Sequence, residues 1–354
     1  MGNPIQVILL PIVIALVVTV LATPISLFFI KKFKIIDDPK QHKHPAIIHK
    51  KPVPRGGGIP LFIGILVAGI LFLPMTKIVI ALFAAGFISL VVGVLDDKFD
   101  LSPYLRFSIN IVSAVIVVAS GVSIPFITNP LGGIFYLNSI TLPFGVLLSS
   151  AVAIVWIVWV MNMLNWSKGV DGQMPGVVAI SAFTIGLLSL RFGLLDTSSI
   201  LSAKLSFIIT GASLGFLIFN FYPAKIFPGY GATAIYLLLS AASILSSAKL
   251  ATAILVMGVP MIDGIITILR RLASGKSPFW HDKKHLHHLL LDLGFGQKKI
   301  ALFYWVISAI LGAVSLLLSS KGKLFAIVMV TIIVGGTFLF LHLALKNANQ
   351  KIRS

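Results

Sequence analysis

The chain contains no cysteine and no glutamate, and it has few charged residues of any kind. Of its 354 residues, 11% are charged and 58% are hydrophobic, whereas a soluble domain has about 25% charged and about 45–50% apolar residues. The missing cysteines exclude disulfides, a thiol nucleophile and a cysteine-ligated metal. The low charge and the mean hydropathy of +1.05 exclude a water-soluble globular protein and a disordered one. The composition therefore predicts a polytopic membrane protein.

Acidic residues are scarce, and all ten of them are aspartates. Lys and Arg together number 28, so the formal net charge is +18. In a membrane protein this excess indicates either the cytoplasmic bias of Lys and Arg in loops or a site for lipid or nucleotide phosphates. A chain this apolar is not expected to bind nucleic acid. Any cluster among so few carboxylates needs a structural or functional reason.

Apolar runs separated by short polar breaks predict an all-α protein with about eleven transmembrane helices in a single membrane domain, 1–354. Each spanning helix needs roughly 20 predominantly apolar residues. The predicted spans are 5–30, 57–73, 78–95, 104–124, 143–163, 173–190, 199–219, 231–247, 249–270, 300–319 and 323–345.

Alternation along these spans divides the connecting segments into two sets. The first set is about 31–56, 96–103, 164–172, 220–230 and 271–299, together with the tail 346–354. Counted with their flanking residues, these segments carry 22 of the 28 basic residues, since only six lie in the other set. The positive-inside rule places the basic set in the cytoplasm. We therefore expect a multi-pass protein of the inner (cytoplasmic) membrane, with its N-terminus outside and its C-terminus in the cytoplasm.

The segment VLDDKFDLSPYLRF, 94–107, holds three aspartates at the cytoplasmic end of the third span. If the helix continues, Asp96 and Asp97 are i,i+4 and i,i+3 neighbours of Asp100. Three carboxylates on one turn repel one another unless a cation lies between them, and the pattern suits Mg²⁺ or a general base. The alternative is a solvated helix C-terminus, where the helix dipole disfavours acidic residues.

Two further segments combine basic residues with features that suit phosphate. In HKKPVPRGGGIP, 49–60, glycine-rich backbone lies beside Lys51 and Arg55. The alternative is a basic loop followed by a flexible helix start. The segment 260–295 contains an intramembrane aspartate, a pair of arginines and HLHH, and it favours a pyrophosphate cradle over a basic membrane-surface loop. Its candidate residues are Asp263, Arg270, Arg271, His285, His287 and His288.

Two more segments carry polar residues at the ends of spans. In MNMLNWSKGVDGQ, 161–173, Asn165 lies before a turn that contains Asp171, although asparagine in a membrane helix also bridges helices. In FNFYPAKIFPGYGAT, 219–233, Asn220 and Phe227 belong to a rigid, partly basic loop. The ring of Phe227 is suited to stacking on a nucleobase or to anchoring at the membrane interface.

Taken together, five motifs in this order resemble one known family over nearly the whole chain. They are HKKPVPRGGG, LDDKFDLSPYLRF, NMLNWSKGVDG, NFYPAKIFPG and SPFWHDKKHLHHLLLDLGF. The chain is similar to the polyprenyl-phosphate N-acetylhexosamine-1-phosphate transferases of glycosyltransferase family 4. The HxHH form of the histidine motif resembles the N-acetylglucosamine-1-phosphate branch rather than the phospho-N-acetylmuramoyl-pentapeptide branch, which typically has three adjacent histidines.

The resemblance implies an enzyme, a phosphoglycosyl transferase with an all-helical membrane fold and a cytoplasmic active site. It implies transfer of N-acetylhexosamine-1-phosphate, with N-acetylglucosamine-1-phosphate the expected group, from a UDP-sugar to an undecaprenyl-type polyprenyl phosphate. UMP is released and Mg²⁺ is the cofactor. The pathway would be synthesis of a cell-envelope glycan, such as lipopolysaccharide or a teichoic acid linkage unit. The implied partners are the two substrates and the membrane, with a homodimer left open.

The resemblance also assigns roles to residues. Asp97, Asp96 and Asp100 are the catalytic candidates, with Asp97 as the group that activates the lipid phosphate. The tentative metal neighbours are Asp96, Asp97 and Asp171. The candidates for substrate binding are Asn165, Asp171, Asn220, Phe227, Arg55, Lys51, Arg270, Arg271, His285, His287 and His288.

At two positions the chain departs from the family pattern. The family has aspartate where this chain has Lys168, and again where it has Tyr230, which is the position of the principal Mg²⁺ ligand. Three hypotheses follow. The Lys168 ammonium replaces the charge of a metal; the chain is an impaired paralogue that binds polyprenyl phosphate or nucleotide-sugar without turnover; or Asp97, Asp100 and Asp171 form a weaker metal site.

Overall fold

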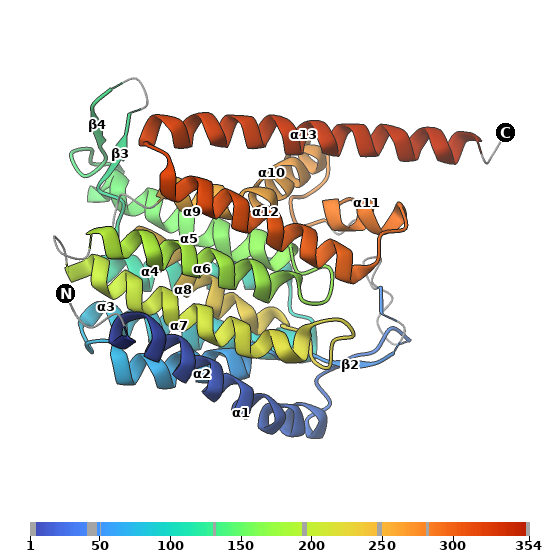
Figure 1. Ribbon diagram of the computed structural model, residues 1–354, viewed down its shortest axis with the longest axis horizontal. Helices are drawn as coiled ribbons and strands as arrows, with labels where there is room; N and C mark the ends of the chain where they lie inside the picture. The colour runs from blue at the N-terminus through green and yellow to red at the C-terminus, as the bar shows by residue number, and fades with distance from the viewer. Residues whose placement is uncertain are drawn as a thin grey trace.

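The computed structural model describes residues 5–40, 48–49, 51–129, 132–192, 197–245, 250–280 and 283–351, with side chains described as far as residue 341. Long helices lie side by side, with the N-terminus at one end of the bundle and the C-terminus at the other (Figure 1). The last helix, α13 (Ser320–Lys351), extends beyond the body of the bundle (Figure 1).

Helices make up most of the described chain. In order, the elements are η1 (Ile5–Leu9), α1 (Leu10–Lys32), β1 (Ile36–Asp37), β2 (Val53–Pro54), α2 (Gly58–Phe72), α3 (Lys77–Phe99), α4 (Pro103–Ala119), β3 (Phe126–Thr128), β4 (Ile134–Tyr136), η2 (Pro143–Gly145), α5 (Leu148–Trp166), α6 (Gln173–Phe192), α7 (Thr197–Asn220), η3 (Tyr230–Ala232), α8 (Thr233–Ile244), α9 (Leu250–Val256), α10 (Gly258–Ala273), α11 (Leu286–Asp292), α12 (Gln297–Leu317) and α13.

The helices identify a polytopic membrane protein, as the composition predicted. Within the described residues, seven helices are long and apolar enough to cross a membrane, or up to eight if the bent pair α9–α10 is one span. Each of the eleven predicted runs contains a helix, but three of these are shorter: α2, α4 and the segment Tyr230–Ile244. A helix of 15 residues, such as α2, is about 22 Å long, less than the hydrocarbon core of about 30 Å. The count of eleven spans is therefore not established by helix length alone.

The predicted span 249–270 is not one straight helix. Its described part is broken at Met257, and α9 and α10 meet at an angle of 82°. The cause lies in the sequence, because the ring of Pro260 clashes with the carbonyl four residues earlier, that of Val256, and proline has no N–H to donate. Val256 is accordingly the last residue of α9.

The centre of the bundle is α8. All twelve of its residues are buried, and it packs against α5, α3 and α7. Because α8 has no polar face, its position is fixed by packing on every side. It begins directly after η3, whose first residue is Tyr230, so the buried helix holds that residue in a set place at one end of the bundle.

The two small sheets lie at opposite ends of the molecule (Figure 1). At one end, β1 and β2 are antiparallel, with Ile36 opposite Pro54 and Asp37 opposite Val53. At the other end, β3 and β4 form a hairpin-like pair. The end with β1, β2 and α11 is where α3, α5, α7 and α10 finish, and it holds the predicted site residues.

Candidate active site

A cavity of about 360 Å³ opens at this end of the bundle. Twelve of the fourteen predicted site residues line it: Arg55, Asp96, Asp97, Asp100, Asn165, Asp171, Asn220, Phe227, Arg271, His285, His287 and His288. The other two, Lys51 and Arg270, are not among the lining residues. Instead, the Arg270 guanidinium donates a hydrogen bond to the Lys284 carbonyl oxygen, at 2.9 Å. The fold therefore gathers segments that are far apart in sequence around one hollow.

Asp97 is buried near the end of α3, where it meets two other segments. Its Oδ1 accepts a hydrogen bond from the Tyr230 backbone amide at 2.8 Å and lies 3.4 Å from Arg55 Nε. Its Oδ2 is buried and has no hydrogen-bond partner within the described chain. Gly229, at φ +68°, passes so close that an added Cβ would lie 2.0 Å from Oδ2. The carboxylate is thus oriented by one oxygen, and the other is free to act.

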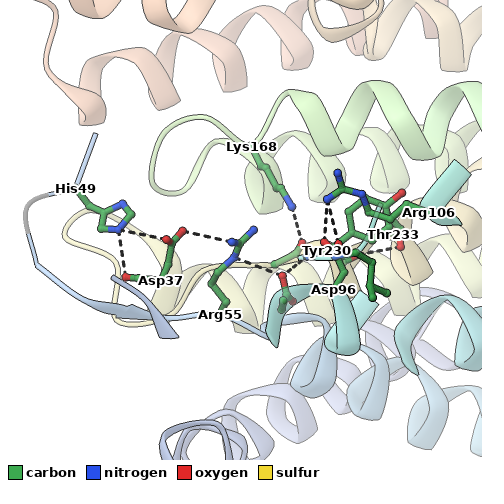
Figure 2. Close-up of polar contacts among 11 residues, drawn as sticks. Asp37, His49, Arg55, Asp96, Arg106, Lys168, Tyr230 and Thr233 are labelled. Carbon is green, nitrogen blue, oxygen red and sulfur yellow. Dashed lines mark hydrogen bonds and ion pairs between the residues drawn. The ribbon is translucent and has the colours of Figure 1, made fainter. Parts of the chain in front are cut away.

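Arg55 continues this contact outward toward the first loop. Its Nη1 lies 3.6 Å from Asp37 Oδ2, and the His49 ring lies beside the same aspartate, with Nε2 3.3 Å from its backbone oxygen. Figure 2 shows the resulting series of polar contacts from His49 through Asp37 to Arg55. The guanidinium therefore bridges an aspartate of the strand β1 and the buried aspartate of α3.

Asp96 points to a different cation. Arg106 Nη1 lies 3.1 Å from both of its carboxylate oxygens, and the Leu101 amide donates to Oδ1 at 3.0 Å. The helix does not continue through the third aspartate: α3 ends at Phe99, and Asp100 is left-handed, with φ 49°. The expected single turn of three carboxylates is therefore not formed, because the chain reverses at Asp100 to enter α4.

Lys168 lies in the short segment between α5 and α6. Its Nζ donates a hydrogen bond to the Gly229 carbonyl oxygen at 2.7 Å and lies 5.9 Å from the centre of the Tyr230 ring. Arg106 Cζ lies 5.2 Å from the centre of the same ring. Burial lowers the pKa of the Lys168 ammonium to about 7, although the Asp97 carboxylate opposes part of that shift. The two residues that depart from the family pattern thus lie near each other, and Figure 2 shows the Lys168 ammonium reaching toward the backbone beside Tyr230.

Asp171 and Asn220 brace the two loops beside the cavity. Asp171 Oδ2 accepts from the Ala224 amide at 2.9 Å, and burial raises the pKa of this carboxyl despite that hydrogen bond. The Asn220 side chain accepts from the Gly172 amide at 3.1 Å and donates to the Ile226 oxygen at 2.8 Å. Both side chains therefore shape the cavity through hydrogen bonds to backbone.

Phe227 is held by its backbone. Its amide donates to the Pro54 oxygen at 2.8 Å, and its own oxygen accepts from the Gly57 amide at 2.9 Å. Its ring packs edge-on against His49, with centroids 5.1 Å apart. The loop after α7 is thereby fastened to the glycine-rich segment, and the aromatic ring is presented to the cavity.

The three histidines stand side by side at the start of α11. His285 Nδ1 lies 3.1 Å from Asp263 Oδ2, so the buried aspartate of α10 orients this ring. The His287 ring stacks on His285 and its Nδ1 is buried without a partner within the described chain. Burial, with its two histidine neighbours, lowers the pKa of His287 well below the usual value. The backbone at Gly169 packs against this ring, since an added Cβ would lie 1.8 Å from its Nε2.

Comparison with known proteins gives a consistent result. The sequence profile described as glycosyl transferase family 4 matches residues 79–247. A Bacillus subtilis protein named as a probable undecaprenyl-phosphate N-acetylglucosaminyl 1-phosphate transferase is 31% identical, over 87% of this chain and 84% of its own length. The chain belongs to glycosyl transferase family 4.

Two further relatives cover different bacterial groups. A decaprenyl-phosphate N-acetylglucosaminephosphotransferase of Mycobacterium leprae is 28% identical, over 95% of this chain and 90% of its own. An undecaprenyl-phosphate alpha-N-acetylglucosaminyl 1-phosphate transferase of Escherichia coli K12 is 28% identical, over 84% and 81%. These names agree with the branch of the family that the HxHH motif predicted.

The donor set of this family member does not fit a magnesium ion. Both oxygens of Asp96 face Arg106, and the Tyr230 hydroxyl accepts a hydrogen bond from Asn110 at 3.1 Å. Mg²⁺ requires several hard, anionic or water oxygens in near-octahedral geometry, whereas the position beside Asp97 holds the Lys168 ammonium. Within the described ranges, no group of three or more histidine or aspartate side chains is arranged to hold a metal ion. Mg²⁺ dependence stays a prediction, which binding measurements can decide.

Three of the residues that form the polar contacts of this site were not predicted: Asp37, His49 and Arg106. A signal for Arg106 was present, because it is the one basic residue at the start of the fourth apolar run. His49 opens the segment that predicted Arg55. Asp37 gave no signal, because a two-residue strand pairing places it and the sequence does not specify that register.

Proposed function

We propose that this chain transfers N-acetylglucosamine-1-phosphate from UDP-N-acetylglucosamine to a polyprenyl phosphate and releases UMP. Membership of glycosyl transferase family 4 and the names of the relatives support this reaction. The observation that carries the proposal is the set of buried polar atoms around the cavity that lack a hydrogen-bond partner within the described chain. They are Asp97 Oδ2, Asn165 Oδ1 and His287 Nδ1.

Such atoms indicate a polar ligand, because buried polar groups in folded proteins almost always have partners. The three atoms differ in the ligand groups that they can bind. Asn165 Oδ1 is an acceptor, which suits an N–H of a base or of an acetamido group. The cavity is also ringed by Arg55, Arg106, Lys168 and Arg271, and these cations suit phosphates. The site can thus hold two anionic substrates at once.

The reaction is a phosphoryl transfer. An oxygen of the polyprenyl phosphate forms a bond to the β-phosphorus of the UDP-sugar, and the bond from that phosphorus to the bridging oxygen breaks. UMP leaves with the bridging oxygen, and the lipid keeps the sugar through a new diphosphate. Asp97, beside Arg55 and with Oδ2 unpartnered, is placed to accept a proton from the lipid phosphate, while arginines stabilise the charge that spreads over the reacting oxygens.

The proposal also includes the topology. The chain crosses the inner (cytoplasmic) membrane eleven times, its N-terminus lies outside the cell, and the cavity opens to the cytoplasm. The basic loops support this orientation, and UDP-sugars are cytoplasmic substrates. The three short helices are compatible with spanning, because each adjoins the cavity at one end: Arg55 precedes α2, Arg106 lies in α4 and Tyr230 precedes α8. Irregular backbone at membrane depth is tolerated where it lines a water-filled hollow. The homodimer stays a prediction, and the pathway proposed is cell-envelope glycan synthesis.

The experiment is UMP release by the purified protein, supplied with UDP-N-acetylglucosamine and polyprenyl phosphate, with and without Mg²⁺. We expect release that requires both substrates. UDP-glucose, which lacks the acetamido group, serves as the matched donor control and is expected to support far less release. No release under any metal condition, from protein that remains folded, would overturn the proposal and return attention to an impaired paralogue.

A further inference from the structure

Lys168 lines the cavity and forms no ion pair with a carboxylate within the described residues, unlike Arg55 and Arg106 beside it. The Asp96 carboxylate faces Arg106 at 3.1 Å, and the Asp97 carboxylate faces Arg55 at 3.4 Å. The hydrogen bond of the Lys168 Nζ goes instead to a neutral acceptor, the Gly229 oxygen. An ammonium has three protons to donate, so two remain for a ligand.

Contacts with neighbouring residues hold the Lys168 side chain in place. It donates a hydrogen bond to Gly229, the same glycine whose backbone closely approaches Asp97 Oδ2. The ring of Tyr230 lies 5.9 Å from the ammonium, within the range of a cation–π contact. The following residue, Gly169, is packed on the His287 ring. The ammonium is therefore held between the buried carboxylate and the histidines.

The charge of this arrangement resembles that of a metal site. Two aspartates at positions 168 and 230, with one divalent ion, would sum to zero. Lys168 with the neutral Tyr230 sums to +1. The present residues thus supply positive charge without a metal, one unit more than the metal-bound pair of aspartates, and in a partly desolvated cavity a charge acts strongly on an anion.

We propose that the ammonium of Lys168 binds the diphosphate of the nucleotide-sugar directly, so that this chain binds its donor substrate without a divalent metal ion. The inference rests on the proposed function for the identity of the donor. It concerns the binding of diphosphate and not the later transfer, so it can be tested in the absence of the lipid acceptor.

Burial lowers the pKa of Lys168 and so disfavours its ammonium form in the free protein. A bound diphosphate offsets this cost, since a nearby negative charge favours the ammonium form. Mg²⁺ would be repelled by the same ammonium. A cation fixed by the fold also needs no recruitment from solution, which is the preorganised arrangement that anion stabilisation requires.

The test is calorimetric titration of the full-length purified protein with UDP-N-acetylglucosamine, in EDTA and in Mg²⁺. We expect the two dissociation constants to agree within about threefold. Lys168→Met, which keeps the length of the side chain and removes its charge, is expected to weaken binding in EDTA by at least about tenfold, since a charge-assisted contact is lost. Lys168→Arg is expected to retain binding within about threefold.

The matched control is Lys225→Met. Lys225 is an exposed lysine in the neighbouring loop that does not line the cavity, so removing its charge should leave binding unchanged. Thermal unfolding in detergent shows whether Lys168→Met is folded, and the comparison of EDTA with Mg²⁺ on the unmodified chain does not depend on any variant.

Binding that requires Mg²⁺, or a Lys168→Met variant that binds as tightly as the unmodified chain, would overturn the inference. Metal-free, Lys168-dependent binding supports it. If such binding is found and no UMP is released when lipid acceptor is added, the proposed transfer fails while the inference about diphosphate stands.

Discussion

The backbone amide of Tyr230 donates a hydrogen bond to Asp97 Oδ1 at 2.8 Å, and this contact joins residues 133 positions apart. It fixes the carboxylate of α3 against the start of the buried helix α8, with Arg55 on the same oxygen. The second oxygen is buried and has no hydrogen-bond partner within the described chain. The structural role of one oxygen and the proposed proton-accepting role of the other can be separated by substitution.

Asp97→Asn tests that separation. Asparagine keeps an oxygen that can accept from the Tyr230 amide, but it removes the negative charge and the capacity to accept a proton. We expect UMP release to fall by about 100-fold or more, as for loss of a general base, with a melting temperature that changes little. Asp292→Asn is the matched control, because Asp292 is exposed and outside the cavity. Full activity in Asp97→Asn would show that this carboxylate takes no proton in the reaction.

Arg106 and Asp96 are expected to be energetically coupled. Arg106→Met leaves the buried Asp96 carboxylate with only the Leu101 amide as a partner, and an uncompensated buried charge is strongly destabilising. We expect the melting temperature to fall by several degrees. Adding Asp96→Asn removes the unpaired charge, so the double variant should be less destabilised than the sum of the two single variants. Additive losses in the thermal unfolding of all three variants would contradict the pairing.

The pattern of apolar runs predicted the helices well, because burial in a membrane demands long apolar segments. Each of the eleven runs contains a helix, from α1 to α13. The pattern did not predict the break at Met257, since Pro260 lies inside an apolar run and was treated as part of it. Nor did it give span lengths for α2, α4 and α8, which depend on how deep the cavity reaches.

The site was predictable in its members but not in its contacts. Asp97, Asn165 and His287 were candidates because polar residues at span ends are rare in such a chain. Their partners were not, because the contact of Arg55 with Asp97 joins residues that are separated by the whole of α2 and most of α3. The expectation that a cation lies between the three aspartates of 94–107 overlooked arginine, which satisfies two of them individually.

Donor binding is expected to weaken as pH rises above about 7. The pKa of Lys168 in the free protein is about 7, set by burial, by the attraction of Asp97 and Asp96 and by the repulsion of Arg55 and Arg106. Bound diphosphate raises that pKa, so binding takes up a proton, and this gain is lost as the free lysine deprotonates.

The measurement is the dissociation constant of UDP-N-acetylglucosamine between about pH 7 and about pH 9. We expect it to rise by up to tenfold per pH unit for the unmodified chain. Lys168→Arg should remove most of this dependence, since a guanidinium does not titrate in this range. Equal pH profiles for the two proteins would show that another group is responsible.

The absence of cysteine makes the topology directly testable. Ser139 lies after β4, at the end of the bundle away from the cavity, and Ser274 follows α10 at the cavity end; both are exposed. Introduced singly, Ser139→Cys is expected to react in intact cells with a maleimide that does not cross membranes, and Ser274→Cys only after the cells are opened. The reverse pattern would place the cavity outside the cell and exclude the proposed use of a cytoplasmic donor.

Restoring both aspartates should change the cation on which the site depends. The double variant Lys168→Asp, Tyr230→Asp removes the ammonium and introduces two carboxylates close to Gly229 and Asp97. The two added carboxylates have no counter-charge of their own, because Arg55 and Arg106 already face Asp97 and Asp96. In EDTA we therefore expect binding of UDP-N-acetylglucosamine to fall by at least about tenfold. Mg²⁺ supplies the missing charge and two hard carboxylate ligands, so its addition should restore binding and raise the melting temperature. The single variant Lys168→Asp, which lacks the second aspartate, should recover less. If the double variant binds the donor equally well in EDTA, then the charge at position 168 does not determine which cation the site uses.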